Sequence, residues 1–171
     1  EANSYKWNLY TDNFTYNADH TMAKGNATGV TSFLNTHYAN DGTYFFSSNN
    51  KVGNSVTLTS KALVAPGIYS AKLYARASGA RANIDVSING VKVATNLYTG
   101  GLSGKEAYNV AFDLSEGTVT VTEVTKIDLS IVVTDVSKSG NLYLNSIELT
   151  KIGDADVEET SSTSTSTSTS T

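Results

Sequence analysis

Residues 83–90 read Asn-Ile-Asp-Val-Ser-Ile-Asn-Gly, and this stretch decides the fold. Ile84, Val86 and Ile88 alternate with polar residues, which is the period-two pattern of a half-buried β-strand. The Asn89-Gly90 pair that follows is the strongest short-range signal for a β-hairpin, because both residues tolerate the positive φ of a type I′ turn. Residues 91–94 are therefore predicted to return as the second strand of an antiparallel pair.

The same alternation of apolar and polar residues extends in both directions from this hairpin. It predicts strands at 5–10, 56–60, 68–76, 108–114, 126–134 and 141–152, with 118–124 as a further candidate. Pro66-Gly67 predicts a turn before the strand that starts at residue 68, because Pro presets φ and Gly accepts a positive φ. Many short strands joined by hairpin turns predict an all-β fold, an antiparallel β-sandwich or jelly roll.

One short helix is predicted near residues 29–39. Val30, Phe33, Leu34, His37 and Tyr38 recur at the spacing of one helix face. The Asn40-Asp41-Gly42 sequence would end this helix.

The C-terminal residues differ in composition from the rest of the chain. An acidic stretch at 154–159 is followed by Ser and Thr alone from Thr160 to Thr171, so no apolar side chain can offset the entropy of ordering this segment. We therefore predict one module at 1–153 and a disordered interdomain linker at 154–171. This organisation favours an extracellular protein, secreted or attached to the cell surface, with further domains of the same polypeptide beyond the linker.

Composition excludes several classes of function. The net charge is −4 with scattered Lys and Arg, so no basic stripe for nucleic acid is present. The chain has no Cys and no apolar run of about 18 residues, which argues against disulfides and a membrane span. It has only two His and no Gly-x-Ser-x-Gly, His-Glu-x-x-His or phosphate-loop motif, so an enzyme is not predicted.

The order of these motifs resembles a known family. Residues 65–76, Ala-Pro-Gly-Ile-Tyr-Ser-Ala-Lys-Leu-Tyr-Ala-Arg, precede the 83–90 hairpin, and residues 140–149 read Gly-Asn-Leu-Tyr-Leu-Asn-Ser-Ile-Glu-Leu. Together they resemble carbohydrate-binding modules with the galactose-binding-like jelly-roll fold, over about residues 55–152. The resemblance implies a sugar site in the loops at one end of the sandwich, with an Asn just before the last strand, which is Asn141 here.

Candidate ligand-binding residues follow from the chemistry of sugars, whose C–H faces stack on aromatic rings while their hydroxyls bond to amides. Tyr98 is the first candidate because it precedes Gly100 and Gly101 in a predicted loop. Tyr38, Tyr44 and Trp7 are further candidates, as is Asn141. For each aromatic the alternative is a side chain that covers the sheet, and Gly140-Asn141 is also ordinary turn chemistry.

No cofactor is predicted. The Glu-x-Glu calcium pattern of the family is absent from residues 7–12, so the sequence does not support a structural calcium.

The sequence thus predicts a non-catalytic module that binds a polysaccharide or oligosaccharide. Within that class an α-glucan such as starch is the preferred ligand, because a curved chain suits a pair of angled aromatics. The alternative is a structural or adhesive β-sandwich spacer of a surface protein with no small ligand.

Overall fold

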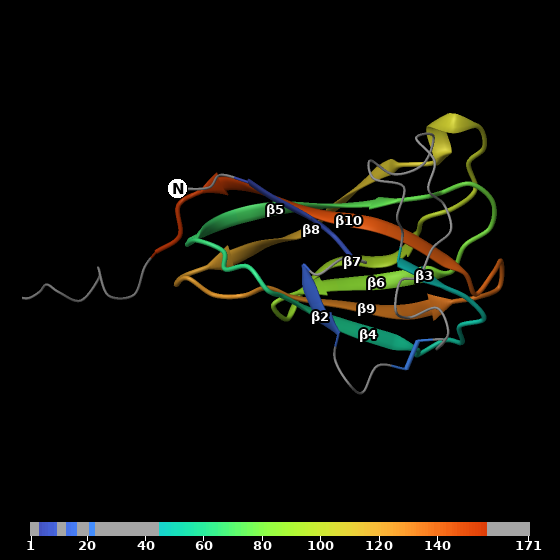
Figure 1. Cartoon of the computed structure of the whole chain (residues 1–171), viewed down its shortest axis with the longest axis horizontal. Helices are drawn as coiled ribbons and strands as arrows, with labels where there is room; N and C mark the ends of the chain where they lie inside the picture. The colour runs from blue at the N-terminus through green and yellow to red at the C-terminus, as the bar shows by residue number, and fades with distance from the viewer. Residues whose placement is uncertain (1–3, 10–12, 17–20, 23–44, 157–171) are drawn as a thin grey trace, which may run out of the picture.

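A computed structural model of the chain describes residues 4–9, 13–16, 21–22 and 45–156, which form a sandwich of two antiparallel β-sheets (Figure 1). The first sheet, called sheet A, has five strands. Four of them follow in the order β1 (Ser4–Asn8), β10 (Leu142–Gly153), β5 (Gly67–Ala75) and β8 (Val110–Val121), and β3 (Phe45–Ser47) pairs with the start of β10. Sheet B has the order β2 (Phe14–Tyr16), β4 (Ser55–Ser60), β9 (Asp128–Asp135), β6 (Asn83–Ile88) and β7 (Val91–Tyr98). The predicted all-β antiparallel sandwich is confirmed.

Helical structure among these residues is limited to one 3-10 turn, η2 (Lys105–Ala107). The helix predicted near residues 29–39 lies outside the residues that the structure describes. Within the described ranges no helix is long and apolar enough to cross a membrane.

The core lies between the two sheets, and the apolar residues of the predicted alternating pattern fill it. Val56 and Leu58 of β4 are buried, and so are the three apolar residues of β6, Ile84, Val86 and Ile88. On the facing sheet Tyr69 and Leu73 of β5 are fully buried. Burying such side chains contributes roughly 1.5–3 kcal/mol each, so the period-two pattern fixes which face of each strand points inward.

The Asn-Gly hairpin between β6 and β7 forms as predicted. Asn89 has φ 51° and Gly90 has φ 81°, the positive values that a type I′ turn requires. The Asn89 side-chain oxygen also accepts a hydrogen bond of 2.8 Å from the Asp128 backbone N–H, which ties the hairpin to the neighbouring strand β9.

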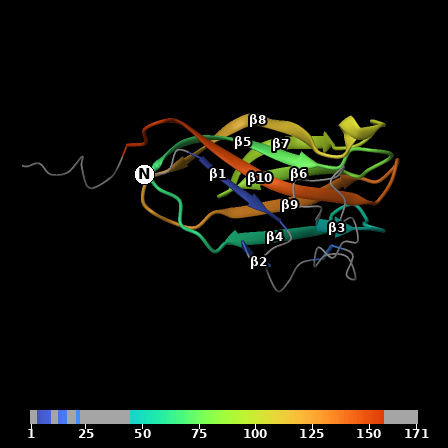
Figure 2. The ribbon, with the colours of Figure 1, turned by 45° about the horizontal axis from the view of Figure 1, so that its top comes forward.

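Strand β8 departs from the prediction because it is one long strand with a wide bulge, not two separate strands. Tyr69 pairs with Val119 and Ala71 pairs with Leu114, so Ser70 alone faces the four residues 115–118. The bulge carries Glu116 toward sheet B, and Figure 2 shows β8 arching beside β7. The Glu116 carboxylate accepts hydrogen bonds from the Thr95 backbone N–H at 3.0 Å and hydroxyl at 2.7 Å, which closes this edge of the sandwich.

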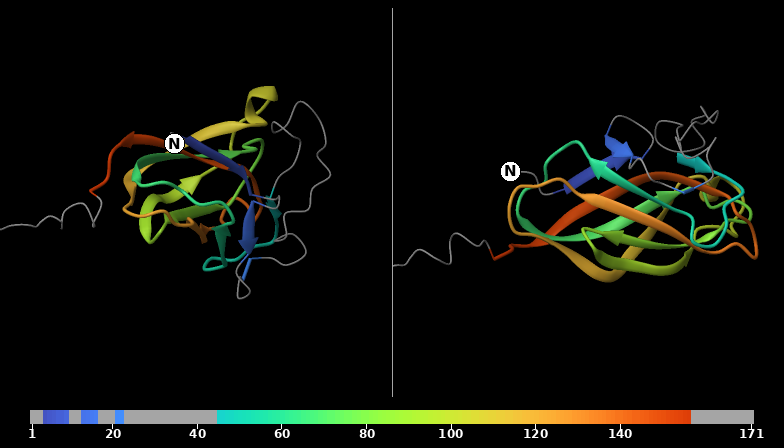
Figure 3. Two further views of the ribbon diagram at one scale, coloured as in Figure 1. Left: turned by 60° about the vertical axis from the view of Figure 1, so that its left-hand side comes forward. Right: turned by 90° about the horizontal axis from the view of Figure 1, so that it is seen from below.

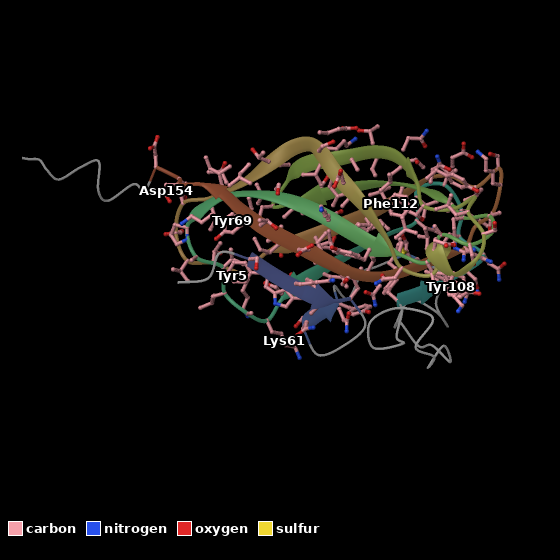
Figure 4. All side chains as sticks on the ribbon, turned by 90° about the horizontal axis from the view of Figure 1, so that it is seen from above. Tyr5, Lys61, Tyr69, Tyr108, Phe112 and Asp154 are labelled. Atoms are coloured by element: carbon pink, nitrogen blue, oxygen red, sulfur yellow. The ribbon has the colours of Figure 1, made fainter. Side chains whose placement is uncertain are left out.

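The two ends of the sandwich are formed by different strand ends and loops (Figure 3). At one end Ser4 pairs with Thr150, so the start of β1 lies beside the end of β10. At the other end Ala75 pairs with Leu144 and Val110, and Asn83 pairs with Tyr98. The loops that follow or precede these residues therefore share the second end, away from Asp154, which Figure 4 labels at the first end.

Candidate functional site

Four loops meet at the second end of the sandwich, and we call this region the loop rim. They comprise residues 48–54, 76–82, 99–109 and 136–141. The Gly101 N–H donates to the Gly79 carbonyl at 2.7 Å, and the Asn50 N–H donates to the Gly140 carbonyl at 3.1 Å. These bonds join the loops in two pairs through backbone groups, without relying on flexible side chains.

Asn141 joins the two pairs of loops. Its carbonyl accepts a hydrogen bond of 2.9 Å from the Ala82 N–H, and its side-chain oxygen accepts one of 3.4 Å from the Asn49 N–H. Asn141 is half-buried, and its side-chain amide nitrogen donates to no other group among the described residues. The rim is thus a preformed unit in which this NH₂ group can donate to a ligand.

Tyr98 lies on the same rim, but it is the last residue of β7 and not part of the loop in which the sequence placed it. The ring is half-buried and lies against Gly101, where an added Cβ would come within 3.1 Å of the ring. Gly101 also has φ +89°, so a larger residue there is disfavoured by both conformation and space. The Lys138 ammonium lies 4.6 Å from the Tyr98 ring centroid. The ring is therefore fixed in place and carries a cation over it.

A second group of aromatic and cationic side chains occupies the sheet A side of the rim. The Arg76 guanidinium lies 5.1 Å from the Tyr108 ring centroid and 5.6 Å from that of Tyr143, and the Arg81 guanidinium lies 4.4 Å from Tyr143. Arg81 is only 6% exposed and donates from Nε to the Arg76 carbonyl at 3.1 Å. Figure 4 shows Tyr108 at this end, beside η2. Sequence reasoning missed both arginines, although two Arg flanking Gly79 in a short interstrand loop were a usable signal.

The loop that carries Lys138 is fixed by Asp135. The Ser137 backbone N–H donates to the Asp135 carboxylate at 2.7 Å. This hydrogen bond, with contributions from the Ser137 side chain and Lys138, lowers the pKa of Asp135 below its usual value. The carboxylate is therefore ionised across the ordinary pH range, which favours this conformation of the loop.

Trp7, which the sequence suggested as a candidate with an exposed or half-exposed position, is not on the rim and is buried. It is 9% exposed and its ring packs edge-on against Phe14, with centroids 5.8 Å apart, and against Tyr5 at 5.5 Å. Trp7 is on β1 at the inner face of sheet A, where it covers the gap to β2. These contacts place Trp7 in the core between the sheets, and a role in sugar binding is not among the features of the rim.

The remaining two candidates, Tyr38 and Tyr44, lie outside the residues that the structure describes. The neighbouring Phe45 is fully buried, as an aromatic run that fills a core would be. Within the described ranges no three His, Cys, Asp or Glu side chains gather as they would around a metal ion.

Comparison with known proteins identifies the fold. A family 35 carbohydrate-binding module from Paenibacillus barcinonensis superposes with a TM-score of 0.52 and 18% identity over 86% of this chain and 99% of its own. A family 35 module from an environmental isolate gives 0.55 and 14%, over 89% and 98%. A Paenibacillus xanthan lyase gives 0.57 and 19% over 84% of this chain, but the chain spans only 12% of that enzyme.

No protein-family model matches the chain, and no curated protein sequence does. The structural likeness, at these low identities, is a likeness of fold. The chain has the β-sandwich jelly-roll fold of carbohydrate-binding modules, as its sequence motifs implied, and whole modules match it over nearly their full length.

Proposed function

We propose that the chain is a non-catalytic module that binds polysaccharide at the loop rim, in an extracellular protein with further domains. The observation that carries the proposal is the pairing of a fixed aromatic ring, Tyr98, with an amide, Asn141, on a preformed rim of a carbohydrate-binding-module fold. The ring supplies a face for sugar C–H groups, and the amide donates to a hydroxyl.

The rim needs no conformational change to present these groups, because its loops are already joined by backbone hydrogen bonds. Preorganisation lowers the cost of binding. One half-buried ring and one amide still make few contacts, so each module should bind weakly. A linker at 154–171 would then raise the effective concentration of several weak sites on one polymer.

The position of the rim suits such a linker. Asp154 lies at the end of the sandwich opposite Tyr108 and the rim (Figure 4). A chain that continues from this end would leave the rim facing away from its neighbour and accessible to a polymer.

The alternative is a structural or adhesive spacer without a ligand. In a spacer the aromatics cover the core, as Trp7 does, and rim amides serve only the loops. Tyr98 and the donor group of Asn141 do not fit this description, because the first sits at the rim beside Lys138 and the second has no protein acceptor among the described residues.

Affinity electrophoresis of the full chain in gels that contain starch, xylan, mannan or pectin tests the proposal. We expect retardation in at least one gel. The starch gel examines the preference for an α-glucan, and the pectin gel examines whether the cations Arg76, Arg81 and Lys138 favour an acidic glycan. Unaltered migration in all four gels would remove the case for binding these glycans.

Variants locate the site. Tyr98→Ala should weaken binding roughly fivefold, since an aromatic contact contributes about 1 kcal/mol, whereas Tyr98→Phe keeps the ring and should bind as the parent does. As a single change, Asn141→Ala should also weaken binding, because it removes the amide that donates to a sugar hydroxyl. Equal retardation of Tyr98→Ala and the parent would place the site elsewhere.

A further inference from the structure

The outer face of sheet A has a hollow that none of the rim residues line. It lies between β5 and β8 and has a volume of about 190 Å³. Its lining residues are Ser70, Ala71, Lys72, Asp113, Leu114, Ser115, Gly117 and Thr118. We call it the bulge hollow, because it forms where β8 swings away from β5.

The bulge explains why the hollow exists. Ser70 is the one residue of β5 that faces the four extruded residues of β8, so the ladder between the strands is interrupted there. Bulges of this kind are over-represented beside functional sites. Gly117 keeps the arch close to β7, since an added Cβ would meet the Lys92 carbonyl and the Val91 side chain at 3.1 Å.

Most of the residues that line the hollow are polar. Ala71 and Leu114 also line it, but they are 5% and 1% exposed and belong to the core between the sheets, so their side chains offer a ligand almost no surface. Ser70, Ser115 and Thr118 carry hydroxyls that can donate and accept hydrogen bonds, and Lys72 adds an aliphatic stem below its ammonium. A sugar ring can bond to such hydroxyls and pack its C–H groups on such a stem.

Lys72 and Asp113 form the most specific part of the wall. They are directly opposite each other across β5 and β8, yet they form no ion pair within 4.0 Å, and neither has another hydrogen bond among the described residues. Side chains directly opposite in a sheet have Cβ atoms about 5 Å apart. An ammonium that only donates and a carboxylate that only accepts are thus set to bind neighbouring hydroxyls of one ring.

The surrounding charges favour a neutral ligand. The register places Lys6, Glu148, Lys72 and Asp113 in one row across β1, β10, β5 and β8, so the charges alternate in sign. Glu148 accepts a hydrogen bond of 2.7 Å from the Tyr74 hydroxyl, and the Lys6 ammonium lies 3.9 Å from the Tyr74 ring centroid. An anionic or cationic ligand at Lys72 and Asp113 would meet a like charge at once, whereas hydroxyls would not.

From these observations we propose that the bulge hollow is a second saccharide subsite, which takes one neutral hexopyranose unit through Lys72, Asp113 and the hydroxyls of the bulge. It lies about 13 Å from the rim, because Ala71 is four steps along β5 from Ala75 and each step spans about 3.3 Å. This inference rests on the proposed function for its ligand class, but it concerns a separate surface. Two sites would let one module hold two chains, or two parts of one chain, of a polysaccharide.

The test is a titration of the full ¹⁵N-labelled chain with methyl glycosides of glucose, galactose and mannose, followed by backbone amide shifts. We expect shifts at Ser70, Lys72 and Gly117 that persist in Tyr98→Ala and disappear in Asp113→Ala and Lys72→Met. Asp156→Asn, an exposed carboxylate far from the hollow, is the matched control and should retain them.

The outcomes separate this subsite from the rim. Shifts at Tyr98, Thr99 and Asn141 alone would overturn the bulge subsite and leave the proposed function in place. Shifts at the bulge alone would support the subsite and overturn the rim as the binding site. Bulge shifts that survive in both Asp113→Ala and Lys72→Met would refute the assigned contacts, and no shifts with any of the three glycosides would overturn the subsite for neutral hexoses.

Discussion

Replacing Trp7 by Ala should destabilise the fold without removing the glycan site. The indole is 9% exposed and packs on Phe14 and Tyr5. Truncation of a buried Trp costs about 3–5 kcal/mol, and the lower value is expected here because β1 is an edge strand whose neighbours can partly collapse. With a urea dependence of about 2 kcal/mol per molar, the unfolding midpoint should fall by about 1.5 M.

The assay is urea unfolding followed by far-UV circular dichroism, because Trp7 is the only Trp and its removal eliminates tryptophan fluorescence. Retardation in the glycan gel, measured on the folded variant without denaturant, should stay within twofold of the parent. Tyr98→Ala is the converse control, with an unfolding midpoint near that of the parent and weaker retardation. A Trp7→Ala chain with an unchanged midpoint and lost retardation would refute this reasoning and return Trp7 to the binding site.

Three further predictions concern contacts that hold the sandwich and the rim. Glu116→Gln should lower the free energy of unfolding by about 1 kcal/mol, because it weakens both hydrogen bonds from β7, while the exposed Glu123→Gln should change it little in the same denaturation assay. For Asp85, partial burial raises the pKa, but hydrogen bonds from a backbone N–H and a lysine outweigh it, so the folded-state pKa lies below the usual value. Its stabilising contribution is present above the unfolded-state pKa of about 3.9 and is lost as pH falls through the lower folded-state pKa. Asp85→Asn should therefore lower the free energy of unfolding by about 1 kcal/mol at pH 7 and by progressively less below about pH 4. A difference between the two proteins that does not change with pH would contradict this. Gly140→Ala should destabilise the fold by about 1–3 kcal/mol and weaken glycan retardation, because its Cβ would lie 2.7 Å from a backbone oxygen of the adjoining rim loop. Gly153→Ala is the control: the nearest contact of its Cβ is at 3.8 Å, so it should have neither effect.

The strands were predictable to the extent that their side chains alternate. The β6–β7 hairpin was predicted correctly, because the apolar period and the Asn-Gly turn are both local properties. Strand β7 extends four residues beyond the predicted end at Ala94, since Asn96 adopts a positive φ of 51° at an irregularity in the pairing and the strand then continues to Tyr98. A sequence pattern that is broken by such a bulge no longer indicates a strand.

The candidate site was predictable only in part. Asn141 and Tyr98 were identified from the sequence and both lie on the loop rim, where their role in binding stays a prediction. Trp7 was misplaced because alternation shows that a strand has two faces but not which face is covered. The arginines of the rim were missed although both flank Gly79 in one short loop, and their contact with a tyrosine at 143 depends on pairing that the local sequence does not show.

What the sequence determined by itself is therefore the all-β class, most strand positions and the resemblance to carbohydrate-binding modules, because these depend on residue spacing and turn chemistry within short segments. The tertiary structure decided which aromatics are buried, which loops form the rim and where the bulge of β8 opens a hollow on sheet A. Those features depend on pairing between strands distant in the chain, such as β5 with β8 and β10, and that pairing reflects the packing of the whole sandwich. The surfaces that we propose for sugar are both products of this long-range packing.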